Sequence, residues 1–277
     1  MATSSSRSLK KPTEAQLLEL QYEGEIKESN SVDALLALSD FLMKGAPGVK
    51  QDPVRAHQLL RRAAKQHRSA RTLQRLATAG WSTEPRTSPD SGFPKTTAAE
   101  SLELLQESLE MEDTPRALCD MAWLIGAPRP RTGVRKDPIR AIQLLERAIA
   151  HSHPPPAEFL HKLAYLLFVG DGSHIDPIRA VSCYKSCVKL SPDPIAMFNL
   201  GYLYHFGKPP LKPCLKRARW WYERVLQFEK CLDTMYFLAC ILCESSQAGD
   251  VERAREMLEE IISRVHYEPA VMLLASM

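Results

Sequence analysis

Apolar and small residues recur at helical spacing between residues 196 and 222, and they predict a pair of helices. The first helix carries these residues on one face: Ala196, Leu200, Gly201 and Tyr204. A glycine on that face lets a neighbouring helix approach closely. The second helix carries one stripe: Ala218, Trp221, Tyr222 and Val225. A single helix pair of this kind cannot bury both of its faces, so the pattern predicts copies of the pair packed alongside.

The copies are present on both sides of this segment. A large apolar residue followed by a small one recurs at Leu38-Ser39, Leu76-Ala77, Met121-Ala122, Leu163-Ala164, Leu200-Gly201, Leu238-Ala239 and Leu274-Ala275. Successive pairs are separated by 38, 45, 42, 37, 38 and 36 residues, a period typical of stacked repeat arrays. Each predicted second helix also has a small residue at the equivalent position of the repeat: Ala56, Ser101, Ala141, Ala180, Ala218 and Ala254.

The start of the second helix is the most specific local signal. Three units have near-identical Asp-Pro-x-Arg-Ala segments, at residues 52–56, 137–141 and 176–180. Aspartate is a strong N-cap, and proline suits the first helical position. In the second unit, Thr97 and Glu100 are spaced as a capping box. The fifth unit has Cys214 at the place of the aspartate, which predicts a less well capped helix, whereas the sixth keeps Asp250 without the proline.

These motifs resemble the Sel-one-like repeat, a longer-looped relative of the tetratricopeptide repeat. The resemblance rests on residues 48–56 and 133–141, on Leu200-Gly201-x-x-Tyr204-x-x-Gly207, and on Ala218-x-x-Trp221-Tyr222. It covers residues 32–277 as six units plus the first helix of a seventh. The resemblance implies an all-α, right-handed superhelical α/α solenoid that ends in a C-terminal capping helix.

The remaining segments are predicted to lie outside the regular repeats. Residues 1–31 are expected to form an N-terminal tail, disordered or partly helical, and residues 80–96 a flexible insertion rich in Pro, Ser and Thr. The N-terminus lacks the apolar region of a secretion signal, and no window is apolar enough to span a membrane. We therefore expect a cytoplasmic protein without a membrane span. The alternative is a mitochondrial one, because Arg7, Lys10 and Lys11 precede the first acidic residue.

Catalytic and metal-binding motifs are missing or weak. The sequence contains no P-loop, no GxGxxG and no HExxH, and its eight histidines are scattered, so we expect no enzyme and no cofactor. The seven cysteines are expected to be reduced. Two pairs one helical turn apart, Cys183 with Cys187 and Cys240 with Cys243, can in principle offer four thiolates to zinc. The first pair occupies repeat positions filled elsewhere by Leu and Ala, which favours small core residues instead.

Charge alternates along the chain. Residues 50–75 hold eight basic residues against one acidic residue, residues 100–120 hold seven acidic against one basic, and residues 205–230 are basic again. The last segment includes Trp220, Trp221 and Tyr222, and basic residues interleaved with aromatics can bind RNA. Two of these aromatics fall on core positions of the repeat, so solvated outer faces or contacts to a charged protein explain the pattern better.

The resemblance to tetratricopeptide-like solenoids implies that the first helices line a concave face. Transferring the outward positions of those helices predicts a partner-binding groove formed by Trp123, His161, Tyr165, Phe168, Phe198, Tyr202, His205 and Tyr236. Exposed aromatic surface of this extent is typical of a partner site. The alternative is that these side chains pack against second helices or against the N-terminal segment 14–29.

The function expected from the sequence is that of a non-enzymatic scaffold or adaptor. It would hold a protein or peptide segment in the concave groove, within a larger complex. The alternatives are a cysteine-rich, redox-linked assembly factor of a mitochondrial complex, an RNA-binding helical repeat protein, and a membrane-anchored quality-control adaptor, against which the missing membrane span counts.

Overall fold

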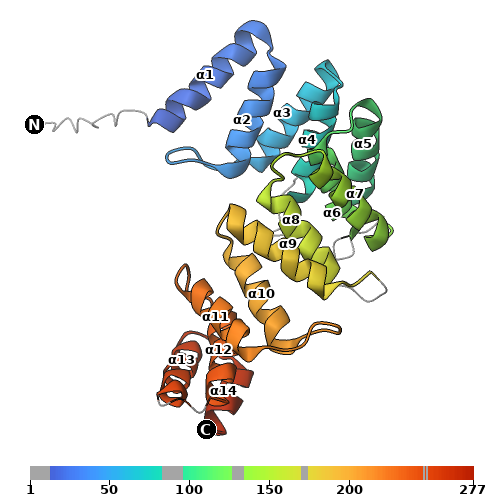
Figure 1. Ribbon diagram of the computed structural model, residues 1–277. Coiled ribbons are helices and arrows are strands. Elements are labelled where there is room, and N and C mark those ends of the chain that lie inside the picture. The colour runs from blue at the N-terminus through green and yellow to red at the C-terminus, as the bar shows by residue number, and fades with distance from the viewer. Residues whose placement is uncertain (1–12, 83–95, 127–133, 170–173, 246, 248) are drawn as a thin grey trace, which may run out of the picture. The chain divides into compact units, whose positions relative to one another are not determined.

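The computed structural model describes residues 13–82, 96–126, 134–169, 174–245, 247 and 249–277 of the chain. These residues form fourteen α-helices and no strand (Figure 1). Their bounds are α1 Glu14–Ser29, α2 Val32–Lys44, α3 Pro53–Gln66, α4 Ala70–Ser82, α5 Ala98–Met111, α6 Pro115–Gly126, α7 Pro138–Ala150, α8 Ala157–Phe168, α9 Pro177–Leu190, α10 Pro194–Phe206, α11 Leu215–Leu226, α12 Leu232–Cys243, α13 Asp250–Arg264 and α14 Glu268–Ala275.

The chain divides into two compact units, residues 1–136 with α1–α6 and residues 137–277 with α7–α14. Within each unit, consecutive helices pack against each other. The most extensive contacts join α2 to α3 and α4 to α5 in unit 1, and α8 to α9, α10 to α11 and α12 to α13 in unit 2. These five pairs are the first, second, fourth, fifth and sixth of the predicted repeats, which confirms the all-α solenoid of helix hairpins.

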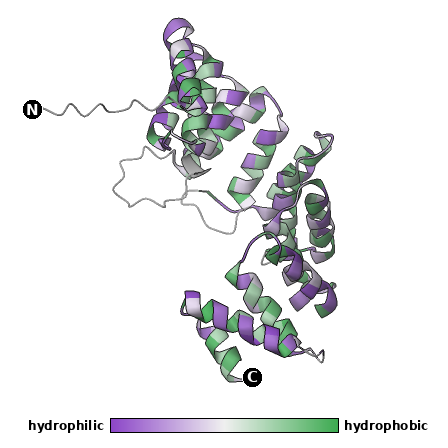
Figure 2. Ribbon diagram, turned by 90° about the vertical axis from the view of Figure 1, so that its left-hand side faces the viewer, coloured by the Kyte–Doolittle hydropathy of each residue, from purple (hydrophilic) through white to green (hydrophobic). Residues whose placement is uncertain are grey.

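The repeat positions read from the sequence are the core of these units. The small residue aligned in all six second helices is 0% exposed: Ala56, Ser101, Ala141, Ala180, Ala218 and Ala254. The large apolar residue of the first helices is buried in the first six units and partly exposed only at Leu274, in the short terminal helix α14. Figure 2 shows the consequence, helices with apolar residues on one side and polar residues on the other. Small residues are needed where helices of adjacent layers approach closely.

Four of the predicted caps of the second helices are confirmed, and the sixth unit differs. The side chains of Asp52, Asp137 and Asp176 accept hydrogen bonds from the backbone N–H three residues later, at 2.9, 2.9 and 3.0 Å. Thr97 forms the capping box with Glu100 at the start of α5. Cys214 makes no side-chain hydrogen bond to α11, as predicted. In the sixth unit, Gly249 is the N-cap, and Asp250 is the first residue of α13.

A second bond recurs in three of the hairpins, the first, fourth and fifth. The backbone N–H of the cap residue donates to a carbonyl near the end of the preceding helix: Asp52 to Leu42 at 3.0 Å, Asp176 to Leu167 at 2.9 Å and Cys214 to Tyr204 at 2.6 Å. In the first and fifth units, the connecting loops also contain isolated bridges, Ala46 with Val49 and Lys208 with Leu211. These bonds satisfy backbone groups in the loops that connect the two helices of these hairpins.

The N-terminal segment contains a helix. Helix α1 begins with a capping box formed by Thr13 and Gln16, and it packs against α2. Its contacts to the first repeat are both apolar and polar. Ile26 is buried in the core of that repeat, with Ala15 and Tyr22 packed against the same core. Gln16 Nε2 donates to the Gly48 carbonyl at 3.1 Å, and Arg55 pairs with Glu19 at 3.3 Å and with Glu23. The segment considered as a possible filler of the groove therefore packs on the first repeat, within unit 1.

Part of the charge alternation is explained by ion pairs between neighbouring elements of unit 1. Arg68 pairs with Glu107, and Arg75 with Asp40. Arg71 pairs with Asp33 at 3.0 Å between two well-exposed side chains. Exposed pairs of this kind contribute little to stability, but they account for basic residues of the segment 50–75 within the chain itself.

Candidate functional site

Aromatic side chains from three first helices of unit 2 meet in one group. Helix α10 supplies Phe198, Tyr202 and Phe206 at intervals of four residues, which places them on one helix face, and His205 beside them. Helix α8 supplies Phe168 at its end, and α12 supplies Phe237. We refer to these residues as the aromatic cluster: Phe168, Phe198, Tyr202, His205, Phe206 and Phe237.

Tyr202 lies at the centre of the aromatic cluster. Its ring centroid lies 5.7 Å from that of Phe168, 6.4 Å from Phe198, 4.5 Å from Phe206 and 5.6 Å from Phe237. These separations fall within or close to the range in which aromatic pairs attract each other beyond simple burial. One side chain therefore links the first helices of three successive repeats.

The floor of the aromatic cluster is Tyr222 of α11, which is fully buried. Its ring stacks on Phe237 at 6.1 Å and lies 5.9 Å from Phe198. This position depends on Gly201, since a Cβ atom there would lie 2.5 Å from Cε1 of the tyrosine ring. Burial raises the pKa of the Tyr222 phenol, whose oxygen has no hydrogen-bond partner among the described residues.

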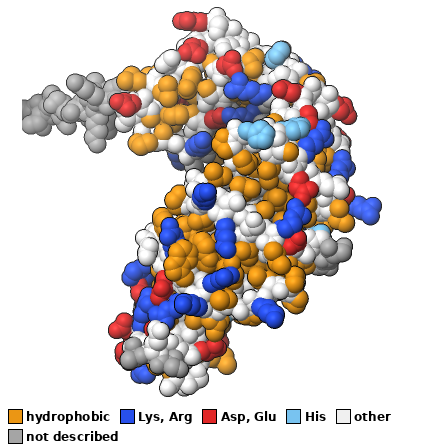
Figure 3. Space-filling view, viewed as in Figure 1, with side chains coloured by type: hydrophobic (Ala, Val, Ile, Leu, Met, Phe, Trp, Pro, Cys, Tyr) orange, Lys and Arg blue, Asp and Glu red, His pale blue; other side chains and the backbone are white. Residues whose placement is uncertain are grey.

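The six side chains of the aromatic cluster carry no charge at pH 7 and are partly accessible, and the nearby Lys208 Nζ donates to the Phe168 carbonyl at 3.3 Å. Phe206 is 49% exposed, and the other five side chains are half-buried. Burial lowers the pKa of His205, so its imidazole is neutral at pH 7. In the face of unit 2 seen in Figure 3, hydrophobic side chains gather over α8–α10, with single Lys and Arg side chains among them.

The structure brings together part of the predicted groove. Four of its eight residues belong to the aromatic cluster: Phe168, Phe198, Tyr202 and His205. Tyr236 lies next to it, 5.5 Å from Phe237 and 5.2 Å from Tyr267. Tyr165 is half-buried on α8, and Trp123 is half-buried on α6, in unit 1.

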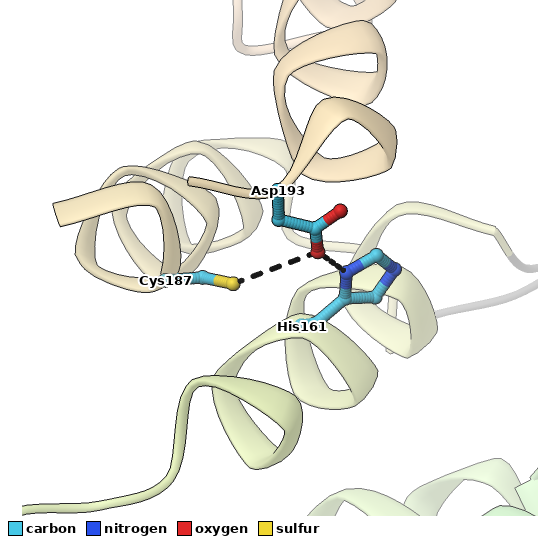
Figure 4. A group of neighbouring side chains, drawn as sticks. All are labelled: His161, Cys187 and Asp193. Carbon is cyan, nitrogen blue, oxygen red and sulfur yellow. Dashed lines mark hydrogen bonds and ion pairs between the residues drawn. The ribbon is translucent and has the colours of Figure 1, made fainter. Parts of the chain in front are cut away.

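His161, the eighth predicted groove residue, makes a polar contact instead. Its Nδ1 lies 2.6 Å from Oδ2 of Asp193, the N-cap of α10, and Cys187 Sγ lies 3.9 Å from the same oxygen (Figure 4). The hydrogen bond from His161 lowers the pKa of Asp193, and burial raises the pKa of the Cys187 thiol to about 11.

Within the described part of the chain, this is the only group of three metal-ligating side chains that lie close together. The sulfurs of Cys183, Cys240 and Cys243 are not part of it, so the four-thiolate arrangement considered from the sequence does not form there. All seven cysteines are free thiols.

Stacked helix hairpins with small residues at the layer contacts define an α/α solenoid of the tetratricopeptide-like class. The Sel1 repeat family model matches four stretches, residues 32–67, 115–153, 157–186 and 194–224. The chain therefore belongs to the Sel1 repeat proteins, as its motifs predicted. The third stretch contains His161 and Phe168, and the fourth contains four more residues of the aromatic cluster, whereas Cys187 lies one residue beyond the third stretch.

Solved structures of similar fold include a Sel1 repeat protein from Oxalobacter formigenes, 22% identical, with a TM-score of 0.60, over 89% of this chain and 93% of that one. A second is c5321, a protective antigen of uropathogenic Escherichia coli with an SLR fold, 16% identical, with a TM-score of 0.65. This chain aligns over 95% of its own length and spans 52% of that protein. A third is the APC/C hetero-tetramer Cut9-Hcn1, 13% identical, with a TM-score of 0.65 over 95% of this chain and 46% of that one.

A search of curated proteins finds no match to the sequence. None of the helices in the described residues is long and apolar enough to cross a membrane.

Proposed function

We propose that this Sel1 repeat protein is a non-enzymatic scaffold or adaptor that binds a protein or peptide segment at the aromatic cluster, within a larger complex. Helical repeats of this class present extended surfaces that are widely used for protein recognition. The observation that carries the proposal is the meeting of six rings from three successive first helices at an accessible surface, with Phe206 half exposed.

The chemistry of the aromatic cluster favours an apolar anchor on the partner. Aromatic side chains are enriched among the residues that dominate binding energy in protein interfaces. Phe206 is 49% exposed, and covering that half removes roughly 100 Å² of ring surface from water, which contributes about 2 kcal/mol. The neutral His205 adds no charge that an apolar side chain would have to desolvate.

A matched pair of substitutions tests this proposal. Phe206 and Phe228 are 49% and 51% exposed, and only the first belongs to the aromatic cluster. We expect Phe206→Ser to weaken capture of the partner about 30-fold, the equivalent of 2 kcal/mol, and Phe228→Ser to leave it unchanged. The measurement is quantitative affinity capture from the source cell, with both variants first shown to unfold at the wild-type temperature.

A protein lost only with Phe206→Ser identifies the partner and places its contact at the aromatic cluster. Equal recovery of the same proteins by the wild type and both variants would show that the aromatic cluster is internal packing and not a binding site.

A further inference from the structure

We propose that His161, Cys187 and Asp193 form a binding site for a divalent metal ion of the zinc type. The three side chains come from different places in the repeat: His161 from α8, Cys187 from the last turn of α9, and Asp193 from the residue that caps α10 (Figure 4). Imidazole, thiolate and carboxylate are the three side-chain ligands that zinc uses most.

The donor atoms are close to the spacing that a tetrahedral ion requires. They all lie within 4.8 Å of one another, with His161 Nδ1 at 2.6 Å and Cys187 Sγ at 3.9 Å from Asp193 Oδ2. Metal–ligand bonds of about 2.0 Å to nitrogen and oxygen and about 2.3 Å to sulfur place tetrahedral ligand atoms about 3.3 to 3.6 Å apart. Binding therefore requires the imidazole and the carboxylate to separate by about 0.7 Å. The sulfur must approach the carboxylate oxygen by about 0.3 Å and the imidazole nitrogen by up to about 1.2 Å, which side-chain rotation can supply.

Two of the ligands are oriented by their own surroundings. The other carboxylate oxygen of Asp193, Oδ1, accepts from the Ile195 backbone N–H at 2.9 Å, so that Oδ2 faces the histidine and the cysteine. The His161 ring packs edge-on against Tyr184 at 5.6 Å. Tyr184 is itself fully buried, and its hydroxyl accepts from Asn199 Nδ2 at 3.0 Å. Outer partners that fix ligand orientation are a regular part of metal sites.

The charge balance of the site suits a divalent cation. Asp193 supplies one negative charge, and Cys187 supplies a second when its S–H bond breaks and a sulfur–metal bond forms, with the proton released to water. The Nδ1 proton that His161 donates to Asp193 must also leave as the metal binds: the imidazole takes the tautomer protonated at Nε2, and the Nδ1 lone pair then coordinates the ion. The side chains of His161 and Asp193 are 20% and 26% exposed, which leaves access for a water molecule as the fourth ligand.

The ligands belong to successive elements, so a bound ion would join α8 and α9 of one repeat to the start of α10 in the next. Binding to the folded state alone stabilises it by mass action. The inference is independent of the proposed partner site, because none of the three ligands belongs to the aromatic cluster.

Cobalt(II) is the probe, because thiolate coordination gives it a charge-transfer band and tetrahedral coordination gives it intense visible bands. The full chain, without a histidine tag and stripped of metal with a chelator, is titrated with Co²⁺ alone and then with Zn²⁺. We expect one Co²⁺ per chain, a thiolate charge-transfer band, and loss of both when Zn²⁺ is added. Zn²⁺ should also raise the unfolding temperature.

The matched control lies on the same helix. Cys187→Ala should abolish the charge-transfer band and weaken Zn²⁺ binding at least 10-fold, whereas Cys183→Ala, one turn earlier on α9, should change neither. Asp193→Asn keeps the oxygen that caps α10 but removes the charge, and it should also weaken Zn²⁺ binding at least 10-fold. This variant provides the test if Cys187→Ala fails to fold.

The inference is overturned if the wild-type chain shows no saturable Co²⁺ binding, or if the same spectrum persists in both Cys187→Ala and Asp193→Asn. In that case the three side chains are a hydrogen-bonded helix cap only.

Discussion

Replacing Gly201 with alanine tests the packing that holds the aromatic cluster in place. The added Cβ would lie 2.5 Å from Cε1 and 2.6 Å from Cδ1 of Tyr222. Carbon atoms in contact sit about 3.5 to 4.0 Å apart, so the tyrosine ring must move by about 1 Å. The ring has little room to do so, because it is fully buried, with the rings of Phe198, His205 and Phe237 around it.

The magnitude follows from two opposing effects. Overpacking a core by one methyl group costs about 1 to 3 kcal/mol. Alanine in place of glycine inside a helix contributes about 1 kcal/mol in the opposite direction. We therefore expect Gly201→Ala to lower the free energy of unfolding by up to about 2 kcal/mol.

Gly24 provides the matched control. It lies inside helix α1, and a Cβ at this position meets nothing within 4 Å. The same substitution there should raise the free energy of unfolding by about 0.5 to 1 kcal/mol, through helix propensity alone. The assay is urea unfolding followed by circular dichroism, with equal slopes for wild type and variants.

The reasoning would be refuted if both alanine variants were more stable than the wild type. A second variant locates the cause. In a Tyr222→Leu background, the ring that blocks the Cβ is absent, so Gly201→Ala should then cost at least 1 kcal/mol less than it does in the wild type.

Three further predictions concern single side chains. Cys214 has φ −148° and ψ 88°, close to the −143° and 81° of the capping residue Asp137, so Cys214→Asp should cap α11 and raise the free energy of unfolding by about 1 kcal/mol in urea. Asp137→Ala should lower it by a similar amount in the same assay. Burial lowers the pKa of His205, so as the pH falls the unfolded state binds a proton before the folded state does. The free energy of unfolding of the wild type is therefore unaffected by this group above about pH 6.5 and decreases below it. Between pH 7.5 and about 5.5, His205→Phe should therefore lose less stability than the wild type.

Much of the fold could be predicted from the sequence because the repeat imposes the same physical demands on every copy. The small residue of the second helix is 0% exposed in all six units, and the Asp-Pro pairs cap the helices they precede. Helix α1 is less evident from the sequence, because it has no clear apolar stripe and only Ile26 of it is buried in the core of the first repeat.

The candidate site could be predicted only in part, because it depends on contacts between repeats. Phe206 and Phe237 are outside the columns transferred from related solenoids, yet both join the aromatic cluster. His161 belongs to one of the predicted columns, but its imidazole is hydrogen-bonded to Asp193. The Asp193-Pro194 pair was the available signal, since it marks a helix cap whose second oxygen is free to accept from a side chain nearby.

The proposed partner contact can be tested most directly by photo-crosslinking in the source cell. A photoreactive phenylalanine analogue is placed at position 206, within the aromatic cluster, and in a parallel chain at position 228, where the exposure is nearly equal at 51% against 49%. Our account predicts a protein crosslinked from position 206 and not from position 228. Crosslinks from neither position, or the same crosslinks from both, would contradict a specific partner at the aromatic cluster.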